Sequence, residues 1–144
     1  MTKISNTNAY PFDTTLSGEE YVIGTEPTGP PQNQTRNYKL SDIKDYVLGY
    51  SSYVATLTQA GTSAPVATVM NNDLGTITYE RNSAGSYSVL SDGLFTNNKT
   101  VVLIGDTNDK ANTYLELVNE DEIIIDTTSD STMTKMSIEI RIYS

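Results

Sequence analysis

The order of apolar and polar positions divides the chain into an irregular first part and a regularly patterned second part. After residue 49, β-branched and aromatic runs recur at roughly ten-residue spacing and are separated by Gly, Asn and Asp. Short runs bounded by turn residues are typical of β-strands. We predict strands over Ser52–Gln59, Pro65–Met70, Thr76–Arg81, Ser86–Leu90, Thr100–Ile104, Thr113–Val118, Glu122–Asp126 and Met136–Tyr143.

The last of these segments has the clearest alternation of apolar and polar side chains. Met136, Ile138, Ile140 and Ile142 face one way, and the residues between them face the other. No long helical pattern follows residue 49, which argues against folds that place helices between their strands. We therefore expect residues 50–144 to form an antiparallel β-sandwich with a jelly-roll-like arrangement.

Residues 40–49 carry the pattern of a short helix that links the two parts. Ser41 is suited to cap its start, Asp42 favours the first turn, and Gly49 is a natural stop. A helix of about two turns is marginal alone, so its apolar stripe is expected to pack on another surface. The stripe comprises Leu40, Ile43, Tyr46 and Val47.

Residues 1–39 are predicted to form an extended attachment arm. They hold all but one of the five prolines, and residues 25–36 read as a polar loop. The run from Tyr21 to Ile23 could form a single strand. The apolar residues of the arm are too few to build a core, yet a typical disordered tail would lack them. We expect them to anchor the arm on a partner; they are Ile4, Tyr10, Phe12, Leu16, Tyr21, Val22 and Ile23.

The composition excludes several classes of chemistry. The chain has no Cys and no His, so it has neither a thiolate nucleophile nor a Ser-His-Asp triad nor a Cys/His zinc site. The net charge of −9 repels phosphate backbones, which disfavours nucleic-acid binding. We find no secretory signal and no apolar run long enough to cross a membrane, so we expect synthesis in the cytoplasm without membrane insertion.

Three features of the sequence have the residue types of functional sites, and we interpret all three as structural. Acid–base pairs could come from Glu19 with Glu20, from Asp42 with Asp45, or from residues 120–122, but most such charges are simply solvated. The 105–110 loop lacks the Gly and the distal Glu of a calcium loop. The ten tyrosines suit glycan-binding surfaces but also suit strands, and they are scattered. We therefore expect no enzyme activity, no catalytic residue, no metal and no cofactor.

Several segments carry a resemblance to a known class of proteins. The stretch from Leu16 to Thr25, its polar spacer, and the stretch from Thr35 to Ile43 together resemble the N-terminal attachment segment of tailed-bacteriophage fibre proteins. Residues 53–65 (YVATLTQAGTSAP) resemble a stretch of virion proteins from phages of Bacteroidetes hosts. Residues 137–143 (SIEIRIY) are similar to the end of the same β domains. The resemblance covers about half the chain and brings no catalytic residues.

The resemblance implies a homotrimeric virion protein. Its arms would bind the major capsid protein or another virion protein, and its β domains would project from the particle surface. The short chain, without coiled coil or repeats, favours a head fibre or capsid decoration. A neck or tail fibre component, and a module that binds host or mucus glycans during host attachment, are the alternatives. An enzyme, such as a glycosidase with two carboxylates, is the remaining and weakest hypothesis.

Overall fold

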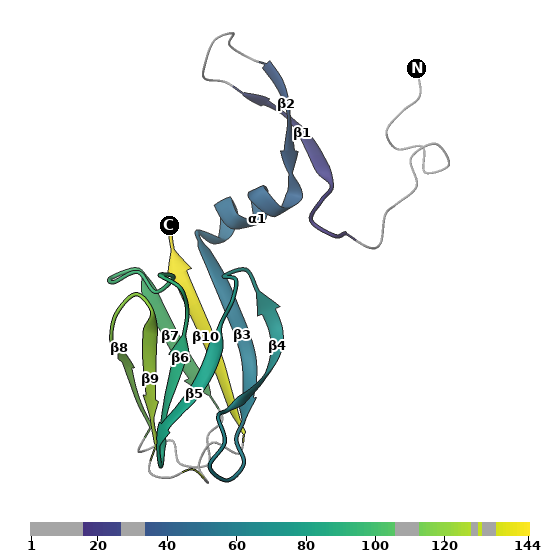
Figure 1. Cartoon of the computed structure of the whole chain (residues 1–144). Helices are drawn as coiled ribbons and strands as arrows, with labels where there is room; N and C mark the ends of the chain where they lie inside the picture. The colour runs from purple at the N-terminus through teal and green to yellow at the C-terminus, as the bar shows by residue number, and fades with distance from the viewer. Residues whose placement is uncertain (1–15, 27–33, 106–112, 128–129, 131–134) are drawn as a thin grey trace. The chain divides into compact units, whose positions relative to one another are not determined.

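The computed structural model describes residues 16–26, 34–105, 113–127, 130 and 135–144 (Figure 1). The chain separates into two compact units, and the boundary falls between Leu48 and Gly49. The first is called here the N-terminal unit and the second the sandwich.

The N-terminal unit contains a β-hairpin followed by a helix. Strand β1 (Tyr21–Glu26) pairs antiparallel with β2 (Gln34–Lys39), and α1 (Leu40–Leu48) follows directly. The single strand and the polar loop predicted here were therefore wrong in part, because both ends of that loop belong to strands. Strand β2 has few apolar side chains, and its main-chain pairing with β1 supplies the hydrogen bonds that sequence pattern does not reveal.

Helix α1 is confirmed within one residue of its predicted bounds. It ends at Leu48, and Gly49 has a φ of 70°, the left-handed stop that the sequence indicates. The assignment of Ser41 as the cap was wrong, because the helix begins at Leu40. The N–H of Leu40 donates to the carbonyl oxygen of Glu20 at 2.9 Å, and the N–H of Ser41 donates to that of Gly18 at 3.1 Å. The segment before β1 thus caps the helix with main-chain oxygens.

The sandwich consists of two four-stranded antiparallel sheets (Figure 1). Sheet I has the order β4-β3-β10-β7, and sheet II has the order β5-β6-β9-β8. All eight predicted strands are confirmed, and their ends differ from the prediction by at most two residues. The bounds are β3 Tyr50–Thr58, β4 Val66–Asn72, β5 Thr78–Ser83, β6 Ser86–Leu90, β7 Thr100–Gly105, β8 Tyr114–Leu117, β9 Glu122–Asp126 and β10 Met136–Tyr143.

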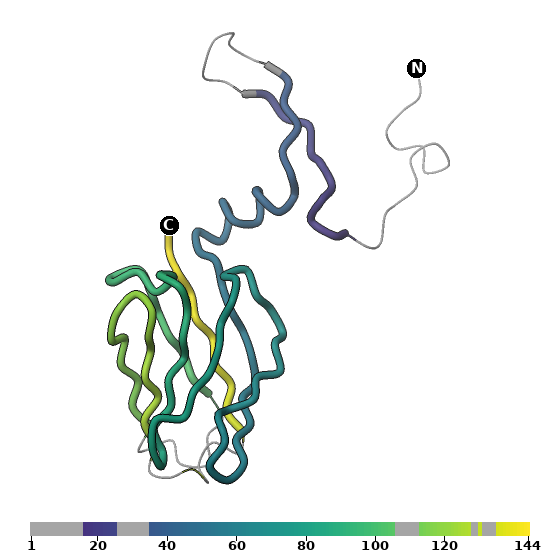
Figure 2. Tube along the Cα trace, in the orientation of Figure 1, coloured from purple at the N-terminus to yellow at the C-terminus, as the bar shows by residue number. Residues whose placement is uncertain are grey.

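Alternate side chains of both sheets meet in one core. In β10, Met136, Ile138 and Ile140 are buried, as the predicted alternation requires, and Ile142 packs against the same core. Figure 2 shows that β3 and β10 run side by side, and Tyr50 lies opposite Tyr143 in their register. The remaining buried apolar residues are Tyr53, Ala55, Leu57, Tyr87, Val89, Phe95, Ile123 and Ile125. This core gives the sandwich a basis for stability that does not require the N-terminal unit.

The core generates a prediction on stability. Replacement of the fully buried Ile138 by Ala should lower the free energy of unfolding by about 2–5 kcal/mol, because it removes buried methyl groups and leaves a cavity. Urea unfolding followed by circular dichroism measures the change. The matched control is Val101→Ala on the outer face of the same sheet, where the side chain is 41% exposed and the expected change is within about 1 kcal/mol. Equal losses in the two variants would contradict this description of the core.

Candidate docking surface

The predicted arm anchors that the structure describes are all exposed. The exposed fractions are 64% for Leu16, 59% for Tyr21, 47% for Val22 and 72% for Ile23. The other three predicted anchors, Ile4, Tyr10 and Phe12, lie outside the described residues. Large apolar side chains gathered at the surface of a small unit are typical of interaction sites.

The β-hairpin distributes these residues over two faces. Tyr21 and Ile23 lie on one face, because side chains alternate along a strand. Val22 lies on the opposite face, across from Tyr38 of β2. The ring of Tyr38 extends over Gly24, where an added Cβ would lie 2.9 Å from its Cε2 atom. Glycine at this position therefore lets Tyr38 lie flat along the hairpin.

The face with Tyr38 continues onto α1 and forms a shallow hollow of about 540 Å³, lined by Tyr38, Asp42, Ile43 and Tyr46. Of the predicted helix stripe, Leu40 and Ile43 are half-buried, whereas Tyr46 and Val47 are 90% and 73% exposed. No residue of α1 is buried among the described residues. Within the N-terminal unit, the described residues therefore leave Tyr46 and Val47 of this stripe uncovered.

Sequence reasoning missed the role of Tyr38. It belongs to the Thr35–Ile43 stretch of the resemblance but was not counted among the anchors, because its ring is isolated between polar neighbours. The available signal was the Gly29-Pro30-Pro31 run midway between two stretches of similar length, which is typical of a turn between paired strands.

The carboxylates beside this surface have structural partners. The carboxylate of Glu20 accepts hydrogen bonds from the N–H of Ser17 at 2.9 Å and from the N–H of Gly18 at 2.8 Å. Together with the hydroxyl of Ser17, these donors lower the pKa of Glu20 to about 2. Glu19 forms an ion pair with Lys39 at 2.8 Å, and this contact raises the pKa of Lys39. Glu20 thus stabilises the turn just before β1, and Glu19 links that turn to the end of β2.

Two of the three acidic residues of the sandwich considered as catalytic, Asp121 and Glu122, are similarly engaged. Asp121 accepts a hydrogen bond from the N–H of Gly93 at 2.6 Å. The carboxylate of Glu122 accepts one from the hydroxyl of Ser88 at 2.5 Å. In the N-terminal unit, Asp42 lines the hollow and Asp45 is exposed. These contacts are typical of structural residues in turns and strands. Among the described residues just named, they do not place two carboxylates together as an acid–base pair would require.

One carboxylate that sequence reasoning did not single out has the most partners. Asp130 accepts hydrogen bonds from the guanidinium of Arg81 at 2.7 and 3.0 Å, from the N–H of Gly85 at 3.0 Å and from the hydroxyl of Tyr87 at 2.7 Å. These donors hold the pKa of Asp130 well below its ordinary value. Burial, together with the hydrogen bond to Asp130, raises the pKa of Tyr87. A carboxylate held ionised by so many donors is poorly suited to deliver a proton.

Metal and membrane features can be stated only for the part of the chain that the structure describes. There, no three Asp, Glu, His or Cys residues gather in a way that could hold a metal ion. Within the same residues, no helix has the length and apolar character needed to cross a lipid bilayer. Residues 106–110 of the loop compared with a calcium site lie outside the described residues.

The tyrosines divide between the core and the surface. Tyr53 and Tyr87 are fully buried, whereas Tyr21, Tyr46 and Tyr114 are exposed on different elements. This distribution agrees with the reading of tyrosine as a strand former, and glycan binding stays a prediction.

No protein-family model, curated protein or solved structure matches the chain. The function therefore has to be argued from the surfaces described above.

The Glu20 contacts generate a prediction on pH. Because the folded-state pKa of about 2 lies below the ordinary 4.5, the stabilisation is complete above pH 4.5 and is lost as the pH falls toward 2. The amide chemical shifts of Leu40 and Ser41, which bond to Glu20 and Gly18, should move over this range in the wild type. In Glu20→Gln the shifts should already be displaced at pH 7. Glu19→Gln is the matched control and should keep the wild-type profile; shifts in Glu20→Gln that match the wild type at every pH would refute this role.

Proposed function

We propose that the chain is a bacteriophage virion structural protein, a short head fibre or capsid decoration anchored to the particle through its N-terminal unit. The sandwich would be displayed outward from the particle surface. The single observation that carries the proposal is the exposed apolar surface of the N-terminal unit, in which Tyr21, Ile23 and Val47 project from a hairpin and a helix with no buried residue in the helix. The resemblance of residues 16–43 to fibre attachment segments supplies the identity of the partner.

The exposed side chains can supply a useful but limited binding energy. Full burial of one large apolar side chain contributes about 1.5–3 kcal/mol. Four such residues, Leu16, Tyr21, Val22 and Ile23, are 47–72% exposed, so covering their remaining exposed surface would contribute at most about 4–7 kcal/mol. Association itself costs about 4–15 kcal/mol in lost freedom. One N-terminal unit would thus bind weakly, and several joined copies would bind far more tightly.

This balance supports the homotrimer that the resemblance implies. When copies are joined, the second and third attachments become intramolecular, and overall binding can rise by about 10²–10⁴-fold without a new contact. The energy balance favours more than one joined copy, and the number three, like the jelly-roll-like arrangement of the outward domains, comes from the interpretation of the sequence and stays part of the proposal. Placement at the neck or tail uses the same attachment and differs only in which virion protein supplies the receiving surface.

A non-catalytic role is part of the proposal. It is supported by the structural contacts of Glu19, Glu20, Asp121 and Glu122, which employ these carboxylates in turns and strand pairing. Turnover of a polysaccharide by the wild type that disappears in Glu122→Gln would revive the glycosidase hypothesis.

Incorporation into particles tests the proposed anchor. Ile23→Asp should reduce the amount of the protein in purified virions by at least about tenfold, because a carboxylate would have to be desolvated at the attachment surface. Quantitative immunoblotting of purified particles measures the amount. The melting transition of the sandwich should be unchanged, since Ile23 belongs to the other unit.

The matched control is Thr25→Asp, which adds the same charge on the same face of β1 at an exposed residue that is already polar. It should retain most of the wild-type incorporation. Incorporation of Ile23→Asp at the wild-type level would show that this face is not the anchor.

A further inference from the structure

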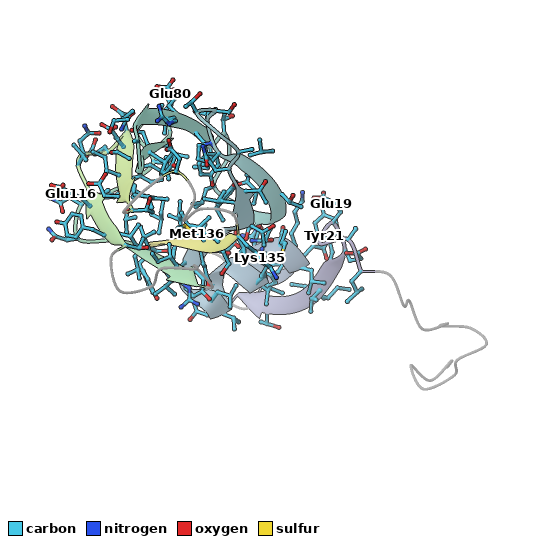
Figure 3. The ribbon with its side chains drawn as sticks, turned by 90° about the horizontal axis from the view of Figure 1, so that it is seen from below. Glu19, Tyr21, Glu80, Glu116, Lys135 and Met136 are labelled. Carbon is cyan, nitrogen blue, oxygen red and sulfur yellow. The ribbon has the colours of Figure 1, made fainter. Side chains whose placement is uncertain are left out.

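The ionisable side chains of the sandwich are unevenly divided between its two outer faces. On sheet II the outward positions hold Glu80, Glu116, Glu122 and Asp126, because their strand neighbours Tyr79, Leu115, Ile123 and Ile125 point into the core. Figure 3 shows Glu80 and Glu116 at the periphery of the sandwich, pointing away from its interior. Arg81, the one basic residue in the strands of this sheet, is bound to Asp130. This face therefore carries a concentrated negative charge.

The outer face of sheet I is electrically neutral. Its four strands contain one acidic and one basic residue, Glu139 and Arg141, and these form an ion pair at 2.7 Å. The guanidinium of Arg141 also lies 4.9 Å from the ring centre of Tyr50, whose ring centre is 5.3 Å from that of Tyr143. The charges on this face already have partners within it. They can be covered by another surface with a smaller desolvation cost than free charges would require.

The same face presents apolar side chains around a hollow. Val101 and Leu103 of β7 alternate with the core residues Val102 and Ile104 and are 41% and 44% exposed. A hollow of about 280 Å³ lies beside Leu103, and its lining includes Val54, Gly105 and Ser137. Gly105 keeps it open, because an added Cβ there would lie 2.9 Å from the Oγ of Ser137. The lining also includes Glu139, which is paired with Arg141. A mainly apolar hollow beside exposed aliphatic side chains can therefore accept a side chain from a facing surface.

We propose that a second copy of this chain docks on the outer face of sheet I. Two chains that each carry a net charge of −9 repel one another over most of their surfaces, and the acidic face of sheet II cannot be shared between copies. Sheet I offers a neutral, partly apolar face on which like charges do not meet. The inference deepens the proposed function, since it names the surface through which copies of the fibre would join, but it concerns the purified chain and is tested without particles.

The test uses a variant that alters the face without altering the net charge. In Val101→Glu/Leu103→Lys, the new carboxylate lies across from Arg141 and the new ammonium lies across from Glu139. Each substitution thus gains an opposite charge on the neighbouring strand, which favours folding of the single copy. Burial of these two charged groups between copies would be unfavourable. The matched control, Thr78→Glu/Tyr114→Lys, makes the same exchange at exposed residues on the edge strands of sheet II.

Sedimentation equilibrium of the full-length chain gives the dissociation constant for self-association. We expect the wild type to associate, the sheet I variant to raise the dissociation constant by at least about tenfold, and the control to stay within about threefold of the wild type. Circular dichroism and the melting transition verify that each variant folds. If the sheet I variant fails to fold, Val101→Glu alone, which keeps the pairing with Arg141, replaces it.

Three results would overturn the proposal. A wild-type chain that stays monomeric at all concentrations would refute docking of a second copy on this face. An equal rise of the dissociation constant in the sheet I variant and in the control would show that the effect does not depend on which face is altered. Loss of self-association in Ile23→Asp, with the sheet I variant unaffected, would place the contact in the N-terminal unit. By contrast, a failed incorporation test with intact self-association would refute the attachment role alone.

Discussion

A hairpin and a short helix can bury only a little apolar surface by themselves. This limit determines which side chains of the N-terminal unit remain exposed. Strands β1 and β2 form a two-stranded ribbon, and α1 has nine residues, so neither element can cover the other. Main-chain hydrogen bonds and the Glu20 contacts define the local geometry, but they leave Tyr21, Ile23 and Val47 in water. A unit with this balance would gain stability if another surface covered those side chains, and the proposed attachment would provide that surface.

The sandwich, in contrast, buries its apolar side chains within its own fold. Its two sheets enclose a contiguous core, so its outer faces are free to differ in character. Sheet II has the acidic side chains Glu80, Glu116, Glu122 and Asp126, which favour solvation and discourage close approach by other acidic surfaces. Sheet I carries one internal ion pair beside exposed aliphatic residues. The contrast gives the proposed particle protein one face suited to contact between copies and one suited to solvent.

The eight strands of the sandwich could be predicted from two signals in the sequence. Apolar and polar residues alternate in β10 because one face is buried and the other is not, and Gly- or Asn-containing turns mark where strands end. Strand β2 could not, because its stability comes from pairing with β1 and not from its own side chains. The helix cap was misassigned for a related reason, since the oxygens that accept from Leu40 and Ser41 belong to the main chain of residues 18 and 20. Asp130 was missed because its partners Arg81, Gly85 and Tyr87 are more than forty residues away. Contacts of long range leave no periodic signal, whereas burial on one face does.

The central claim is that the N-terminal unit becomes firmly ordered only against a partner surface. Hydrogen–deuterium exchange of the purified chain, compared with the same chain in assembled particles, tests it most directly. We predict rapid exchange of the β1, β2 and α1 amides in the free chain, slow exchange of the β3 and β10 amides in both states, and strong protection of the hairpin and helix in particles. Equal protection of the N-terminal unit and the sandwich in the free chain, or no gain on assembly, would contradict the account.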